Sequence, residues 1–274
     1  MTTAALWIVR RGTAGRKAAP AVLVVSSLLF GASATLTIAS SAAMSAMGGM
    51  PMPGGWTMSM AWMRMPGQTW GGAAASWLFM WVVMMVAMML PSLVPTLYRY
   101  REAVTSHAEP RLGMLTALVS LGYLCVWTLV GMVAFPLGLA LAEAEMRHPG
   151  LSRAVPIAAG AIVLAAGASQ FTAWTAHHLA CCRDFFERHR SLPADAGIAW
   201  RHGLRLGRHC SYSTAGLTAI LLVMGVMDLS VMAAVTTGIT AERLAPAGER
   251  VARAIGVIVI SAGVLLLARA AHLR

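Results

Sequence analysis

Long apolar runs recur along the chain at the length of helices that cross a lipid bilayer. A hydrocarbon core about 30 Å thick requires about 20 apolar residues in a helix. Seven runs approach or exceed this length, and charged residues concentrate between them. They lie at residues 20–39, 73–97, 113–142, 154–174, 211–227, 229–245 and 252–268. The pattern therefore predicts an all-α fold, a polytopic transmembrane helical bundle of about seven spans.

Basic residues are distributed unequally between the two sides that these spans define. Of the 21 lysines and arginines, 16 fall on one side, which receives the N-terminus, 98–111, 175–210 and 243–253. Basic loops favour the cytoplasmic side, so we expect a bacterial inner-membrane protein with a cytoplasmic N-terminus. The sixth run is the weakest because it is short and ends in Glu242 and Arg243. Without this sixth span, however, Arg243, Arg250 and Arg253 would lie on the periplasmic side of the membrane.

The first run has an alternative interpretation as a cleaved signal peptide. It follows a basic start and precedes small residues, which is the order of a secretory signal. Its apolar stretch is longer than a usual signal core, which favours a retained anchor, whereas cleavage would leave six spans. Either interpretation leaves residues 40–72 on the periplasmic face.

Three regions follow from this topology. Residues 1–39 form a basic cytoplasmic N-terminus and the first span (or the signal peptide), and residues 40–72 form a periplasmic methionine-rich loop. Residues 73–268 form a six-span helical membrane domain with a basic cytoplasmic Cys/His loop at 175–210.

Composition supports a membrane protein and removes two other classes. The chain is 58% hydrophobic and 11% charged, with a mean hydropathy of +0.69, whereas a soluble domain carries about a quarter charged residues. The net charge of +11 follows from loop asymmetry, so we expect no nucleic-acid partner. The four cysteines lack the spacing of a secreted disulfide scaffold.

The 40–72 loop is rich in methionine. Eight methionines lie between Met44 and Met65, and six of them form Met-x-Met pairs. Thioether sulfur is a soft ligand that favours Cu(I), and it binds without losing a proton. The candidate ligands are Met58, Met60, Met63 and Met65. The competing interpretation is that these methionines and the nearby tryptophans only pack at the bilayer interface.

A second set of methionines lies in the second span. Met80, Met84 and Met88 are four residues apart, so they form a stripe along one face of a helix. Met84 and Met88 are the candidate ligands of a path from the outer loop toward the inner face. Packing is the alternative, and for this stripe alone it is the better one.

Cysteine and histidine cluster after the fourth span. His178, Cys181 and Cys182 lie at i, i+3 and i+4, which places them on one face of a helix. Cys210 lies at the start of the fifth span. The end of the helix of the fourth span and the start of the fifth can therefore supply four ligands to one metal at the cytoplasmic face. The alternative is that these cysteines pack as small apolar residues.

Several of these motifs together resemble a bacterial domain-of-unknown-function family described as predicted metal-binding integral membrane proteins. They are "GGWTMSMAWMRMPGQTW", "MWVVMMVAMMLPSLVP", the Cys/His turn and "GVMDLSVMA", and the resemblance covers about residues 45–268. His178 stands where that family has a cysteine, whereas Cys182 and Cys210 match its cysteines. Ser213 and Thr214 replace two further cysteines. The resemblance implies metal binding and no particular reaction.

We therefore expect a membrane protein that captures a soft metal, Cu(I) before zinc, and transfers or inserts it. Its expected partners are membrane lipid, the metal ion and a protein that donates or accepts the metal. No catalytic motif is present in the sequence, which favours a carrier over an enzyme. Two alternatives stay open, a membrane thiol-disulfide oxidoreductase and a metal-free structural or assembly subunit.

Overall fold

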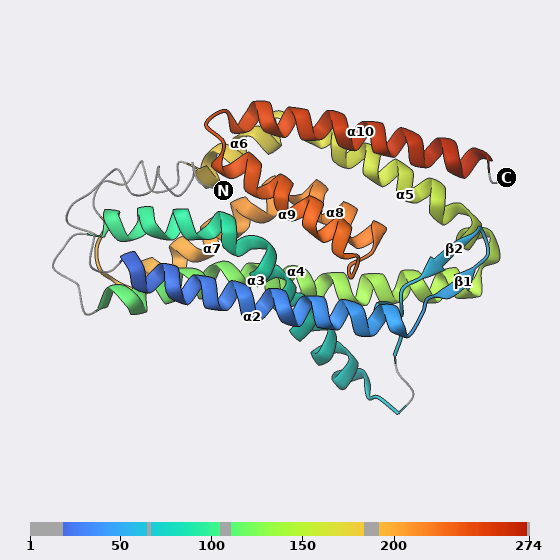
Figure 1. The fold of residues 1–274 in the computed structure, drawn as a ribbon, viewed down its shortest axis with the longest axis horizontal. Helices are drawn as coiled ribbons and strands as arrows, with labels where there is room; N and C mark the ends of the chain where they lie inside the picture. Colours follow the sequence, from blue (N-terminus) through green and yellow to red (C-terminus); the bar gives the residue numbers. More distant parts are fainter. Residues whose placement is uncertain (1–18, 65–66, 105–110, 184–191, 273–274) are drawn as a thin grey trace.

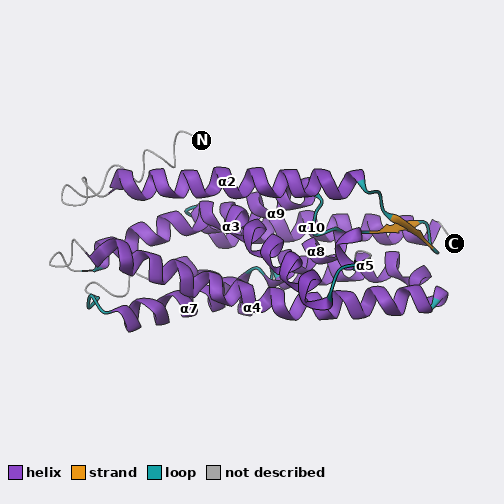
Figure 2. Cartoon of the chain, turned by 90° about the horizontal axis from the view of Figure 1, so that it is seen from below, coloured by secondary structure: helices purple, strands orange, loops and turns teal. Residues whose placement is uncertain are grey.

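The computed structural model describes residues 19–64, 67–104, 111–183 and 192–272, which form an elongated bundle of helices (Figure 1). Most of the helix axes run along the long direction of the bundle (Figure 2). The helices are α2 (Ala19–Ala46), α3 (Trp70–Ala103), α4 (Leu112–Arg147), α5 (Pro149–Ser169), α6 (Ala173–Arg183), α7 (Ala196–Ser213), α8 (Ala215–Met224), α9 (Leu229–Leu244) and α10 (Gly248–His272). The predicted all-α fold is confirmed, apart from one short hairpin between α2 and α3.

Five helices are long and apolar enough to cross a membrane by length and composition, namely α2, α3, α4, α5 and α10. Their outward faces carry large exposed apolar side chains, such as Leu28 on α2 and Ile258 on α10, each 68% exposed. Apolar surface on this scale is unusual for a soluble monomer. Both features are compatible with a multi-pass membrane protein.

The expected fifth and sixth spans differ from the other five. The stretch 211–227 is interrupted at Thr214, where α7 ends and the ten-residue α8 begins. The sixth, α9, has 16 residues, whereas a perpendicular crossing needs about 20. Asp228 caps α9 by accepting hydrogen bonds from the amides of Ser230 and Val231.

The region expected to be a loop at 175–210 contains α6 and most of α7. Helix α7 is amphipathic, and its buried residues recur every three or four positions. A hydropathy window misses such a helix, because arginines on its outer face offset its small buried residues. Gly203 of α7 packs against the backbone of Val119 on α4, and Gly122 of α4 faces Trp200. Small residues at these contacts let the two helix backbones approach closely.

The core centres on α3, which has the largest buried share of the five long helices. The indole nitrogen of Trp81 on α3 donates a hydrogen bond to the carbonyl of Trp127 on α4, at 2.9 Å. Helix α3 thus lies at the centre of the core and carries Met80, Met84 and Met88.

Candidate metal centre

The loop between α2 and α3 is a folded hairpin that is attached to α5. Strand β1 (Met50–Met52) pairs with the antiparallel strand β2 (Trp56–Met58). Gly54 and Gly55 make the turn with positive φ values of 110° and 75°, a conformation that favours glycine. The indole of Trp56 donates a hydrogen bond to the carbonyl of Ser152 at 2.9 Å, and the Ser152 hydroxyl donates to the carbonyl of Pro53 at 3.0 Å.

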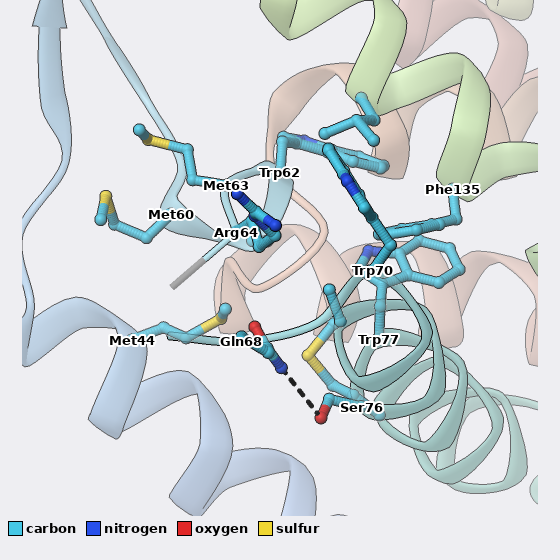
Figure 3. A pocket seen from close by; sticks show the side chains of 14 residues that line it. Met44, Met60, Trp62, Met63, Arg64, Gln68, Trp70, Ser76, Trp77 and Phe135 are labelled. Carbon is cyan, nitrogen blue, oxygen red and sulfur yellow. Dashed lines mark hydrogen bonds between the residues drawn. The ribbon is translucent and has the colours of Figure 1, made fainter. Parts of the chain in front are cut away.

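A short 3₁₀ helix, η1 (Met60–Trp62), follows the hairpin and turns the chain back toward α3. The Ser59 side chain caps η1 by accepting a hydrogen bond from the amide of Ala61, at 3.3 Å. The turn places Met60 and Met63 at a pocket between the loop and α3. Figure 3 shows these two methionines on one wall and the ring of Phe135 on another.

Four half-buried methionines from three segments line this pocket: Met44, Met60, Met63 and Met80. We call this set the methionine pocket. Met44 comes from the end of α2 and Met80 from the third turn of α3. The pocket holds about 150 Å³ of space for water-sized spheres, several times the volume that one water needs. A metal ion with one or two further small ligands therefore fits inside.

Four of the ten other lining residues are aromatic: Trp62, Trp70, Trp77 and Phe135. The rings of Trp62 and Trp77 lie 5.7 Å apart, and Trp77 stacks on Trp81 at 5.1 Å. The Arg64 guanidinium lies 4.8 Å from the centre of the Trp70 ring, a cation–π contact. The described lining residues include no carboxylate, imidazole or thiol. Among them, thioether sulfur is therefore the main metal-binding group that the pocket offers.

The predicted loop ligands have different positions. Met60 and Met63 line the pocket, whereas Met58 is 2% exposed and packs with Met52 beneath the hairpin. Met65 lies outside the described residues. The sequence analysis counted Met44 among the loop methionines and Met80 in the stripe, but it selected neither as a ligand.

The predicted methionine stripe runs through the interior of the bundle. Met84 is 0% exposed and Met88 is 3% exposed, and both pack in the main core beside Met85 and Met89. Met80 lies one turn before Met84, so it joins the stripe to the methionine pocket. These positions suit packing, and the four-residue spacing of Met80, Met84 and Met88 also places them along one face of α3.

The four predicted Cys/His ligands are divided among three environments. His178 on α6 lies against His209 on α7, with 2.9 Å between their Nδ1 atoms. Cys181 is half-buried near the exposed His177, with 3.6 Å between Sγ and Nε2. Cys182 is buried. Neighbouring residues on a helix project about 100° apart, so Cys181 and Cys182 face different surroundings.

Cys210 is fully buried, and its sulfur lies 2.9 Å from the hydroxyl oxygen of Tyr123 on α4. Among the described residues, no group of three or more His, Cys, Asp or Glu side chains is placed to hold a metal ion. The structure therefore does not assemble the predicted four-ligand cluster as a single site.

Burial governs the protonation of these groups. Desolvation lowers the pKa of His178, with further lowering from His177 and Arg208, and it also lowers the pKa of His209. The pair is therefore neutral at pH 7, and one ring donates to the other. Desolvation raises the pKa of the Cys182 thiol to about 12, so without a bound cation this thiol keeps its proton at pH 7.

A family model described as "PpoB2: Copper chaperone" matches residues 78–266. The matched segment contains Met80, the methionine stripe and all the cysteines, whereas the hairpin and η1 precede it. The description agrees with the expected metal-related family and with copper, and it lends no support to zinc. No curated protein and no solved structure matches the chain.

Proposed function

The chain belongs to the PpoB2 family of copper chaperones, and from this premise we propose that it captures Cu(I) in the methionine pocket and transfers it to an acceptor protein. The observation that carries the proposal is the convergence of Met44, Met60, Met63 and Met80, from three separate segments, on one cavity. Core packing alone gives no reason for four half-buried thioethers around open space.

The chemistry of the pocket suits a chaperone. Thioethers prefer Cu(I) to harder divalent cations. They are neutral, so binding neither needs nor releases protons. Neutral ligands also hold the ion less strongly than thiolates, which favours onward transfer. The aromatic walls shield the ion from water without competing for it.

The onward route in this proposal follows α3. Met84 and Met88 continue from Met80 into the core, and α6 lies toward the opposite end of the bundle from the hairpin (Figure 1). The receiving ligands are two of those selected from the sequence, Cys182 and Cys210, because His178 and Cys181 contact other side chains. The protein would then act in the bacterial inner membrane, with the methionine pocket on the periplasmic side.

The test compares two variants with the same number of Met→Leu changes. The pocket variant replaces Met44, Met60, Met63 and Met80, which preserves apolar bulk and removes the sulfur atoms. The control replaces four exposed methionines outside the pocket: Met114, Met132, Met146 and Met224. Competition with a colorimetric Cu(I) chelator, in proteins whose cysteines are replaced by serine, measures the affinity of the methionine ligands alone.

We expect the pocket variant to bind Cu(I) about tenfold more weakly or worse, a loss comparable with that caused by disturbing a metal site. The control should bind like the wild type. Equal affinities of the two variants would show that the pocket methionines serve packing only.

A further inference from the structure

Arg243, in the last turn of α9, places a guanidinium among the helices without an anionic partner. Its Nη1 atom donates a hydrogen bond to the Ser92 hydroxyl at 3.2 Å, its buried Nε and Nη2 atoms lack an oxygen or nitrogen acceptor, and the Cys210 sulfur is a hydrogen-bond neighbour of the guanidinium. The neighbouring Glu242 interacts electrostatically with Arg243, but its carboxylate accepts a hydrogen bond from Gln170 at 2.9 Å. No described carboxylate forms an ion pair with Arg243. A buried charge in this state is costly unless something compensates it.

The groups that surround this guanidinium are thiols and a phenol. Its electrostatic neighbours are Cys210, Cys182 and Tyr123, and the Tyr123 hydroxyl is 2.9 Å from the Cys210 sulfur. The two cysteines are buried in the same core cluster. They come from α6 and α7, and Cys182 interacts electrostatically with both Cys210 and Arg243, so α9 brings a cation close to the two thiols.

We propose that Cys182 and Cys210 bind one Cu(I) as a dithiolate inside the bundle, with Arg243 as the counter-ion of that complex. The proposal deepens the proposed function, since it names the ligands and the charge partner of a second copper site. His178 and Cys181, which face other surroundings, do not belong to this site.

Copper binding supplies the guanidinium with a negatively charged partner. On binding, each S–H bond breaks, each sulfur forms a bond to the metal, and both protons leave to water. Copper stays Cu(I), so no electron is transferred. Two thiolates and one Cu(I) carry one net negative charge, which the guanidinium neutralises. The free nitrogens of Arg243 then also acquire an acceptor, because thiolate sulfur accepts hydrogen bonds.

The same balance discriminates between metals. A divalent ion such as Zn²⁺ would give a neutral dithiolate and leave Arg243 unpaired, and it would require about four ligands. The site therefore selects a monovalent soft ion. It also lies where the methionine stripe ends, because Ser92, the partner of Arg243, is one turn beyond Met88 on α3.

The four cysteines provide a matched pair of double variants for the test. Cys182→Ser with Cys210→Ser removes the proposed ligands, whereas Cys125→Ser with Cys181→Ser removes two other thiols. Each full-length protein is titrated with Cu(I), and the ultraviolet absorption of thiolate-to-copper charge transfer is recorded. We expect the first variant to lose this absorption and one copper per chain, and the second to keep both.

Arg243 is tested separately with both thiols in place. Arg243→Gln should weaken the thiolate-bound copper by at least about tenfold, the size of effect expected when one partner of a buried charge pair is removed. Arg243→Lys, which keeps the charge, should recover part of this loss. Zn²⁺ should not displace Cu(I) from the wild-type protein.

X-ray absorption at the copper edge tests the same ligands without cysteine substitutions, so it remains informative if a cysteine variant does not fold. It is measured on the methionine-pocket variant with its native cysteines, loaded with Cu(I), and should show two short copper–sulfur bonds. Coordination by nitrogen or oxygen, or an unchanged affinity of Arg243→Gln, would overturn the inference. Since the methionine test reads affinity at the pocket and this test reads thiolate absorption, the two proposals can fail independently.

Discussion

The indole ring of Trp62 lies directly against Gly138 of α4, where a β-carbon would overlap the six-membered ring. Trp62 ends η1, and its other side approaches Trp77 of α3. The missing side chain at Gly138 therefore makes room for the residue that holds the methionine loop against the bundle. One glycine on α4 thus determines where the wall of the pocket lies.

Gly138→Ala should displace Trp62 and distort the methionine pocket. Alanine favours a helix over glycine by about 1 kcal/mol, so a net loss of stability would come from the overlap with the ring. We expect lower Cu(I) affinity and a shifted tryptophan fluorescence spectrum. Gly113→Ala, with no atom within 4 Å of its new β-carbon, is the control and should match or exceed wild-type stability. Unchanged affinity and fluorescence in Gly138→Ala would contradict this role for Trp62.

The hydrogen bond from Trp56 to the Ser152 carbonyl should tether the hairpin to α5. Trp56→Phe keeps an aromatic ring and removes the donor, at a cost of about 1 kcal/mol. Amide hydrogen exchange in residues 50–58 should then accelerate, while α3 keeps its protection. Trp70→Phe changes a ring that is 57% exposed and serves as the comparison. Equal exchange rates in the two variants would show that the tether does not hold the hairpin.

Asp228 should stabilise α9 as its N-cap, and the effect should depend on pH. Hydrogen bonds from the Val231 and Ser230 amides lower the pKa of this carboxyl. Its contribution is therefore present above the unfolded pKa of about 3.9 and is lost as pH falls through the lower folded value. Asp228→Ala should cost about 1 kcal/mol at pH 7, measured by thermal unfolding in detergent.

Asp228→Asn separates the charge of this cap from its hydrogen bonds. Asparagine is a comparable N-cap, so this variant should lose less stability than Asp228→Ala at pH 7. The difference between wild type and Asp228→Asn should disappear at acid pH. A difference that persists unchanged below the folded pKa would contradict the cap as the pH-sensitive element.

The sequence predicted the helical class and the loop that supplies the pocket, because both depend on local composition. It placed residues 196–210 in a loop, although Asp195 provides a cap and the buried positions of α7 have helical spacing. A search for amphipathic periodicity would have found that helix. The contribution of Met44 to the pocket could not be predicted, since it depends on how α2 and α3 pack.

The Cys/His region shows a second reason why the predictions from the sequence and the structure differ. Spacing on one helix selected Cys181 and Cys182 together, yet adjacent side chains point about 100° apart, and only Cys182 is buried. In the sequence analysis, Arg243 served only to assign the membrane topology. Its proximity to Cys210 follows from the packing of α9 beside α3 and α6, which no local pattern encodes.

The close contact between α4 and α7 should be intolerant of added bulk. Gly203→Ala would push a methyl group into the carbonyl of Val119, and a backbone atom cannot move aside as a flexible side chain can. We expect a loss of about 2 kcal/mol or more, seen as a lower unfolding temperature or a low yield of folded protein. Gly71→Ala, whose β-carbon meets nothing within 4 Å, should be neutral. A normal unfolding temperature for Gly203→Ala would mean that the two helices are farther apart than described.

The orientation of the bundle can be tested from its two ends. The hairpin and the start of α7 lie at opposite ends of the long axis (Figure 1), and the end with α7 carries most of the basic residues, which predicts a cytoplasmic location. Thr57→Cys and Ala194→Cys introduce thiols at exposed positions near these two ends. Cys125 and Cys181, which are not fully buried, are first replaced by serine to remove background. A thiol reagent that cannot cross membranes should label position 57 in intact spheroplasts, and position 194 only after the membrane is permeabilised. Labelling of both positions from the same side would exclude this topology, and the reverse pattern would place the methionine pocket on the cytoplasmic side, where it could not capture periplasmic copper.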